Sequence, residues 1–193
     1  MIHTYTYTRI SPPLQEICRY AGCPEPGEAE TAQIHACLAE AEGKLACRVC
    51  FTELPLPWDK LPADSRSLQV YLTGCSRILL FGATIGLETD RLIARYGRIS
   101  PVKSLFFQAI GAAAIEELCD TFCRDMEQAY APARLKPRFS PGYGDVPLTL
   151  QRDIFALLDC PRKIGLTLNE SMLMSPGKSV TALVGIQDPS ETI

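Results

Sequence analysis

The chain has 193 residues, of which 47% are hydrophobic and 21% are charged, and its formal net charge is -3 at pH 7. This length and composition fit an ordered globular protein with a sizeable core and exclude a disordered chain. The negative charge and the absence of any lysine and arginine run argue against binding to nucleic acid or to anionic membranes. No apolar run resembles a signal peptide or approaches a membrane span. We therefore expect a cytoplasmic protein.

The nine cysteines predict a reduced protein rather than a disulfide scaffold. Most of them lie within apolar patterns, as expected of small buried side chains in a reducing compartment. Cys47 and Cys50 have the C-x-x-C spacing, but an alternating strand pattern places their sulfurs on opposite faces. Cys119 and Cys123 share one helical face, where they could hold a metal or simply pack. The two histidines have no metal-ligand spacing, and we predict no metal site.

The first 75 residues predict two strands and three helices. Residues 2–8 alternate like an edge strand, and residues 45–52 alternate like a half-buried strand. The apolar spacing of i, i+3, i+4 and i+7 predicts three helices, over residues 14–21, 34–41 and 68–75. The third of these helices can be capped at its N-terminus by Asp64.

Residues 78–95 have the order of strand, glycine turn and helix that begins a nucleotide-binding site. Residues 78–81 are a buried-strand run, and glycines follow at positions 82 and 86. The G-x-G-x-x-G spacing is absent, and no repeated β-α-β units follow. We interpret the segment as a tight strand-to-helix connection, with a phosphate-binding loop as the alternative.

The longest predicted helix begins at Ser100-Pro101 and runs to about residue 129 without an internal proline. Small and apolar residues form a stripe that includes Leu105, and we expect this helix to be central to the fold. Glu116 and Asp120 are four residues apart and therefore share a face. Their spacing fits either a solvated surface or a cleft that holds a cationic ligand.

The C-terminal part predicts a helix and then strands. Helices and antiparallel strands are thus segregated, which predicts an α+β fold with an antiparallel sheet packed against a long central helix and several shorter helices. We expect an N-terminal portion (1–75) and a second portion (76–193) within one compact domain. The C-terminal elements are a helix at 151–158 and strands at 164–168, 172–174 and 179–185, with a hairpin turn at 175–178.

The loop at 137–147 brings together a cation, permissive backbone and an aromatic ring. This grouping suits an anionic or zwitterionic small ligand. The alternative is an ordinary connecting loop in which the glycines supply positive φ angles and the tyrosine is buried. The candidate ligand-binding residues in this loop are Arg138, Ser140, Gly142, Tyr143 and Gly144.

Three short motifs follow one another in the C-terminal part: Arg138-x-x-x-Gly142-Tyr143 is followed by Leu-Thr-Leu-Asn-Glu-Ser-Met-Leu-Met at 166–174 and by Pro-Gly-x-Ser-Val at 176–180. Their order resembles the activation domain of cobalamin-dependent methionine synthase. The similarity also reaches residues 86–90 and the helix at 109–122. The length of the chain suggests a freestanding version of this domain.

The resemblance implies that the chain binds S-adenosylmethionine and supports reductive reactivation, in which cob(II)alamin returns to methylcobalamin. Arg138 would pair with the methionyl carboxylate. Asp120 or Glu116 would face the ligand's amino group, and the Tyr143 ring would lie near the sulfonium. Backbone amides of the glycines would approach the adenosine. No residue of this chain is assigned a catalytic role.

The chain departs from the family pattern after Tyr143, where Gly144-Asp145 replaces a proline. A second acid before the arginine and a late tyrosine are also missing. Because an Asp-x-His-x-x-Gly cobalt-ligand motif is absent, we expect cobalamin only through a partner, which is a methionine synthase or another corrinoid protein. A flavodoxin-like or other electron donor is the second expected partner. An S-adenosylmethionine sensor, or a reactivator of a different corrinoid methyltransferase, stays open as the alternative function.

Overall fold

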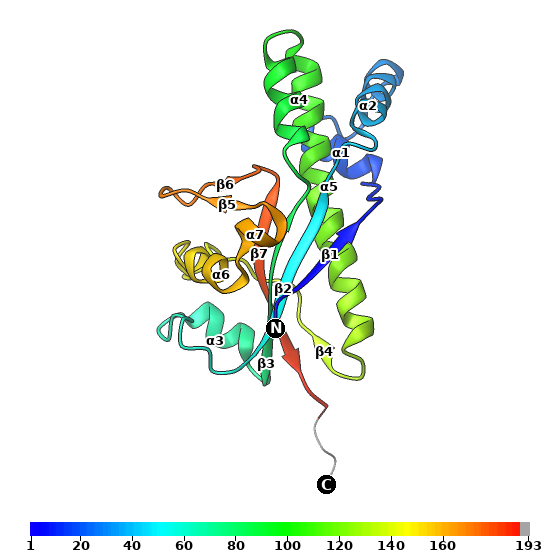
Figure 1. Cartoon of the computed structure of the whole chain (residues 1–193). Helices are drawn as coiled ribbons and strands as arrows, with labels where there is room; N and C mark the ends of the chain where they lie inside the picture. The colour runs from blue at the N-terminus through cyan, green and yellow to red at the C-terminus, as the bar shows by residue number, and fades with distance from the viewer. Residues whose placement is uncertain (190–193) are drawn as a thin grey trace.

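A computed structural model describes residues 1–189 and has a five-stranded antiparallel sheet with helices on both faces (Figure 1). In order across the sheet, the strands are β1 (His3–Tyr7), β2 (Cys47–Pro55), β3 (Arg77–Thr84), β7 (Ser179–Gln187) and β4 (Arg134–Leu135). A separate two-stranded sheet consists of β5 (Thr167–Leu168) and β6 (Met174–Ser175). The helices are α1 (Leu14–Tyr20), α2 (Glu28–Ala41), α3 (Arg66–Leu72), α4 (Glu88–Gly97), α5 (Pro101–Ala129), α6 (Leu150–Leu158) and α7 (Cys160–Ile164).

Every neighbouring pair of strands in the main sheet is antiparallel. The predicted α+β fold, with a long helix packed against an antiparallel sheet, is therefore confirmed. Gly82 lies inside β3, opposite Cys50 of β2 and Thr181 of β7. The segment at 82–86 thus completes a strand and leads into α4, without the parallel β-α-β arrangement of a nucleotide-binding fold.

One face of the sheet packs against α5. The helix begins as predicted, since the Ser100 side chain accepts a hydrogen bond of 3.5 Å from the Lys103 amide. Phe122 is fully buried under the sheet, and its ring centroid lies 4.9 Å from that of Phe81 and 5.2 Å from that of Phe51. Because α5 also contacts β4 and β7, part of its surface faces the segment that follows β4.

The opposite face of the sheet is covered by α3, α6 and α7 (Figure 1). The prediction of a half-buried strand over 45–52 is wrong for its second half. Cys50 and Thr52 are buried as well, because α6 and α7 pack against β2. Cys47 belongs to the cluster under α5 and Cys50 to the cluster under α7, so their sulfurs do lie on opposite faces.

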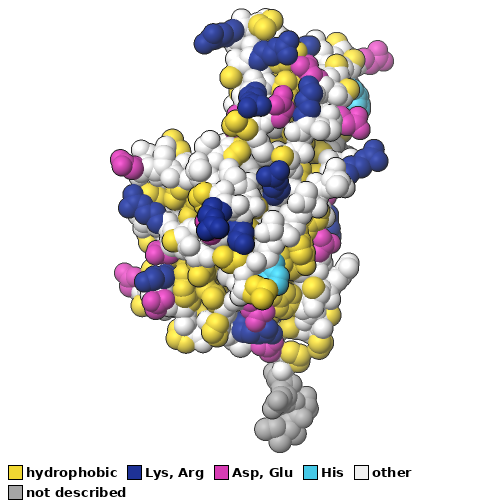
Figure 2. Space-filling model, in the orientation of Figure 1, with side chains coloured by type: hydrophobic (Ala, Val, Ile, Leu, Met, Phe, Trp, Pro, Cys, Tyr) yellow, Lys and Arg dark blue, Asp and Glu magenta, His cyan; other side chains and the backbone are white. Residues whose placement is uncertain are grey.

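The N-terminal half of α5 extends beyond the sheet and forms a helical arm with α1, α2 and α4 (Figure 1). Its apolar interior includes Ile17, Ile34, Leu92 and Phe107. Figure 2 shows Lys and Arg side chains gathered at the end of this arm. Leu105, the first residue of the predicted stripe, is 47% exposed, whereas Ala109 and Ala113 of the same stripe are buried. No helix among residues 1–189 is long and apolar enough to span a membrane.

Residues 159–178 differ from the prediction. Residues 160–164 form α7, and only the last two residues of the predicted strand at 164–168 are extended. The predicted hairpin turn at 175–178 is also wrong, because β5 and β6 pair with each other and β7 pairs with β3 and β4. Cys160 and Ile164 are buried as an i, i+4 helical pair against the sheet. These tertiary contacts favour the helix over an extended chain.

Two distant parts of the chain meet at the start of α3. Its N-cap is Ser65 rather than the predicted Asp64, and the Ser65 hydroxyl accepts a hydrogen bond of 3.1 Å from the Leu68 amide. The Asp145 carboxylate accepts hydrogen bonds from the Ser65 hydroxyl (2.5 Å) and from the amides of the first two helical residues (2.8 and 3.2 Å). An anion is favoured here because the first amides of a helix have no partner within the helix. Asp145 therefore anchors the candidate ligand loop to α3.

Replacement of Asp145 by asparagine is expected to lower the stability of the protein at neutral pH. The hydrogen bonds from Ser65, Arg66 and Ser67 lower the pKa of the Asp145 carboxyl in the folded state. Its contribution is therefore present above the unfolded pKa of about 3.9 and is lost as pH falls through the folded pKa. The difference in urea midpoint between wild type and Asp145→Asn should be larger at pH 7 than at pH 3. Equal differences at the two pH values would contradict this role.

Candidate functional site

A pocket of about 570 Å³ lies between α5, β7 and the segment that follows β4. Five of the seven predicted site residues line it, and they come from two parts of the chain. The structure thus joins the acidic face of the long helix to the arginine of the candidate loop. The predicted residues in the lining are Glu116, Asp120, Arg138, Ser140 and Tyr143.

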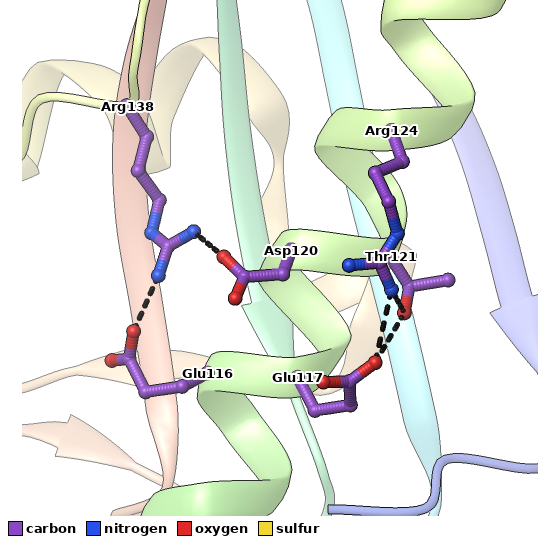
Figure 3. Close-up of polar contacts among 6 residues, drawn as sticks. All are labelled: Glu116, Glu117, Asp120, Thr121, Arg124 and Arg138. Carbon is purple, nitrogen blue, oxygen red and sulfur yellow. Dashed lines mark hydrogen bonds and ion pairs between the residues drawn. The ribbon is translucent and has the colours of Figure 1, made fainter.

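Arg138 forms ion pairs with both acids of α5 (Figure 3). Its Nη1 atom donates to Asp120 Oδ1, and its Nη2 atom donates to Glu116 Oε2. Burial disfavours the charged guanidinium, but the hydrogen bond to Asp120 and the neighbouring carboxylates outweigh burial and raise the pKa of Arg138. The guanidinium is therefore a fixed cation held by two carboxylates.

The spacing of the two acids explains their shared partner. Glu116 and Asp120 stand on successive turns of α5 and point to the same side, where Arg138 reaches them from the neighbouring segment (Figure 3). Arg124 forms an ion pair with a different acid, since its Nη2 atom donates to Glu117 Oε1 at 2.9 Å. Two carboxylates thus face the single guanidinium of Arg138, and this cluster has one surplus negative charge.

Backbone pairing with β7 holds Arg138 over α5. Leu135 of β4 pairs with Ile186, and Phe139 forms a bridge to Leu183 with N···O distances of 2.9 and 2.8 Å. Arg138 lies between these two anchored points. The position of its backbone is therefore set by the edge of the sheet rather than by a free loop.

Tyr143 lies at the rim of the pocket. The residue is 62% exposed, so the alternative of an ordinary loop with a buried tyrosine is wrong in that respect. The Tyr143 and Phe139 rings meet in a T-shaped arrangement, with centroids 6.1 Å apart and an interplanar angle of 77°. Tyr143 can therefore present an aromatic face to a ligand while Phe139 supports it.

Gly142 and Gly144 shape the loop and are not among the residues that line the pocket. Their φ angles are +90° and +58°, which favour glycine. The Gly142 amide donates to the Val146 carbonyl at 3.0 Å. A Cβ atom at Gly144 would lie 2.4 Å from Ser67 Oγ, so only glycine lets the loop approach α3 this closely. Their predicted contact with adenosine stays a prediction.

Sequence patterns did not identify the apolar side of the pocket. Val180 and Val184 of β7 line it together with Leu135 of β4 and Cys123 of α5. Burial raises the pKa of the Cys123 thiol, although Arg138 opposes this shift. Val180 and Val184 have the even spacing of one strand face, but only the packing of α5 against β7 identifies that face as the pocket wall.

Two helical cysteines, Cys119 and Cys123, have different environments. Cys119 is fully buried, and burial raises the pKa of its thiol. Cys123 is partly exposed at the pocket. Within residues 1–189, no group of three or more His, Cys, Asp or Glu side chains is arranged to hold a metal ion. Cys119 therefore serves the core rather than a ligand site.

Comparison with known proteins identifies a related domain. Residues 126–192 match the family model described as "Vitamin B12 dependent methionine synthase, activation domain". The chain also resembles a solved structure described as "Crystal Structure of the MetH Reactivation Domain bound to AdoHcy", with a TM-score of 0.73 and 16% sequence identity over 100% of this chain and 80% of that chain. No curated protein matches the chain. The predicted resemblance is thus confirmed, by the family model for the C-terminal part and by the fold for the whole chain.

Proposed function

We propose, on the premise of this resemblance to a methionine synthase activation domain, that the chain binds S-adenosylmethionine and supports the reductive methylation of cob(II)alamin. The observation that carries the proposal is the cluster of Arg138, Glu116 and Asp120 at one pocket. The volume of this pocket, about 570 Å³, is in the range of small-molecule sites. The related solved domain is bound to AdoHcy, which supports the same class of ligand.

The charged groups of this pocket match those of S-adenosylmethionine. Arg138 would donate two hydrogen bonds to the ligand's carboxylate, and Asp120 or Glu116 would accept from its ammonium group. Each internal ion pair would be exchanged for an ion pair with the ligand, so that no charge is left without a partner. The carboxylate of the cluster that does not receive the ammonium group would favour a positive sulfonium over a neutral thioether.

The remaining predicted residues would contribute shape and polarity. The Tyr143 ring at the rim would lie near the sulfonium, a contact of about 0.5–2 kcal/mol. The Ser140 hydroxyl, also in the lining, would offer a hydrogen bond to the ligand. Gly142 and Gly144 would act by holding the loop in the conformation that places Tyr143 beside the pocket.

We infer that the cobalamin comes from a partner, a vitamin B12-dependent methionine synthase or another corrinoid protein, and that a flavodoxin-like or other donor supplies the electron. The site is open to such a partner. The side chains of Arg138, Glu116 and Asp120 are 24%, 42% and 49% exposed, so a methyl donor held by them would stay accessible from outside.

Isothermal titration calorimetry tests the ligand. S-adenosylmethionine is expected to bind at one site per chain, alone or with a corrinoid partner present, whereas ATP and NAD are expected not to bind. No S-adenosylmethionine binding under either condition would overturn the proposal. The absorbance of cob(II)alamin in a methionine synthase supplied with reductant then tests the role, since binding without conversion would favour the alternative of a sensor.

Asp120→Asn is expected to weaken S-adenosylmethionine binding about tenfold or more, because a hydrogen bond to a charged group is worth about 1.5–3 kcal/mol. The loss should be smaller for AdoHcy, which lacks the positive sulfonium that the surplus negative charge favours. Calorimetry with both ligands checks this difference. Asp59→Asn is a matched control, because the Asp59 side chain is 78% exposed and outside the pocket. Equal affinities for Asp120→Asn and wild type would refute the assigned contact.

A further inference from the structure

Two cysteine thiols are in contact on the sheet face opposite α5. The Sγ atom of Cys50, on β2, lies 3.8 Å from the Sγ atom of Cys160, the first residue of α7. Both residues are fully buried. They are 110 residues apart in sequence, so only the fold brings them together. Neither cysteine lines the pocket between α5 and β7, and the proposed function does not use them.

Gly82 makes room for this pair. It lies opposite Cys50 in the sheet, next to both sulfurs. A Cβ atom at this position would be 3.1 Å from Cys160 Sγ and 3.7 Å from Cys50 Sγ. Glycine within a strand often marks a place where another group approaches the backbone closely. Here the approaching groups are the two sulfurs.

We propose that Cys50 and Cys160 form a reversible dithiol site, which a hydroperoxide converts into a disulfide between β2 and α7. The Cys50 thiolate attacks one oxygen of hydrogen peroxide, which gives a sulfenic acid and releases hydroxide. The Cys160 sulfur then displaces hydroxide from the Cys50 sulfur and forms the S–S bond. In total, two thiols lose two electrons and two protons, and one hydrogen peroxide becomes two waters. A dithiol reductant restores both thiols by exchange.

The assignment of Cys50 as the attacking sulfur follows from its surroundings. The contact with the Cys160 sulfur lowers the pKa of the Cys50 thiol in spite of burial, and Lys163 acts in the same direction. A thiolate is the reactive form of cysteine. Cys160 is then the resolving thiol; since either sulfur can donate in this contact, the same balanced reaction also follows with the two roles exchanged.

The geometry of α7 allows the bond to form. The sulfurs must move from 3.8 Å to about 2.0 Å. Cys160 belongs to a helix of five residues, bounded by the left-handed residues Asp159 (φ 49°) and Gly165 (φ 72°). Such a short element can shift or open locally without breaking the strand pairs of the main sheet, which also gives a small oxidant access.

The test is oxidation of the folded chain with an equimolar amount of hydrogen peroxide. Remaining thiols are then alkylated, and peptides are mapped by mass spectrometry without reduction. We expect a cross-linked peptide that contains Cys50 and Cys160 in most of the chains, and its loss after treatment with dithiothreitol. Recovery of both residues as alkylated thiols or as separate oxyacids, or a cross-link that forms only in urea, would overturn the proposal.

Variants of single cysteines identify the pair. Cys50→Ser and Cys160→Ser should each abolish the cross-link, whereas Cys47→Ser, on the other face of the same strand, should retain it. The neighbouring thiols of Cys18 and Cys23 are a competing pair. Recovery of their disulfide in place of the expected one would contradict the proposal. The wild-type peptide map decides the question even if a variant fails to fold.

Discussion

Arg138→Ala is expected to abolish S-adenosylmethionine-dependent conversion of cob(II)alamin in a methionine synthase supplied with reductant. The guanidinium is the proposed partner of the ligand's carboxylate and is held in place by Glu116 and Asp120. Truncation of one member of a hydrogen-bonded charge pair costs about 2–5 kcal/mol, which corresponds to a loss of affinity of roughly 30-fold or more. Calorimetry measures that loss, and the absorbance of cob(II)alamin measures the conversion.

The same substitution should leave the fold intact. Backbone pairing to β7 holds the segment around Arg138, and the Arg138 side chain lines the pocket and is not part of the apolar clusters. Removal of the cation leaves two carboxylates four residues apart on α5, which costs only a few tenths of a kcal/mol at an exposed helix face. Circular dichroism and the urea midpoint are therefore expected to change little.

Two further variants separate charge from geometry. Arg138→Lys retains the charge but loses the planar, bidentate fork, so we expect an affinity between those of wild type and Arg138→Ala. Arg162→Ala is a matched control, because the Arg162 side chain is 86% exposed on α7 and lies outside the pocket. An Arg138→Ala protein that binds and converts like wild type would refute the assigned role.

Phe122→Ala is expected to cost about 3–5 kcal/mol in the free energy of unfolding, as is typical of a buried aromatic side chain cut back to alanine. The Phe122 ring is fully buried between α5 and the sheet and lies 4.9 and 5.2 Å from the rings of Phe81 and Phe51. Because a domain has a total stability of about 5–15 kcal/mol, this loss is a large part of the whole. Urea denaturation measures the change in midpoint and slope.

Leu105→Ala is the matched control on the same helix. Leu105 is 47% exposed on the arm, so its truncation should change the free energy of unfolding by about 0.5 kcal/mol or less. A small effect of Phe122→Ala, or equal effects of the two variants, would show that α5 is not held to the sheet by this aromatic cluster. The pair thus tests which face of the long helix is the core face.

The candidate site was partly predictable because its chemistry lies in short motifs. Arg138 and Tyr143 are separated from the later motifs at 166–174 and 176–180 by spacings that resemble the activation domain, and Glu116 and Asp120 share a face in any helix. Spacing alone left the two acids open to a solvated role. Pairing of the segment around Arg138 with β7 brings the guanidinium over α5, where it pairs with both acids, and their contact with a ligand stays a prediction.

The predictions of secondary structure and of the α3 cap were wrong where tertiary contacts decide between local alternatives. Residues 164–168 were predicted as one strand, but Ile164 is buried together with Cys160 in the helical turn of α7 against the sheet, and only Thr167 and Leu168 are extended. The cap of α3 involves Asp145, some 80 residues after the helix begins, and no local pattern could identify that partner. The Gly144-Asp145 departure from the family pattern therefore coincides with a contact that anchors the loop to α3.

The amino-acid sequence by itself determined the α+β class, the long helix from Ser100-Pro101, the candidate loop at Arg138 and the face shared by Glu116 and Asp120. These features depend on local periodicity, caps and side-chain types, which act over a few residues. Only the tertiary structure decided that the arginine meets both acids, that Val180 and Val184 line the same pocket, and that the Cys50 and Cys160 thiols touch. Such contacts depend on strand order and helix packing, which join residues far apart in the chain.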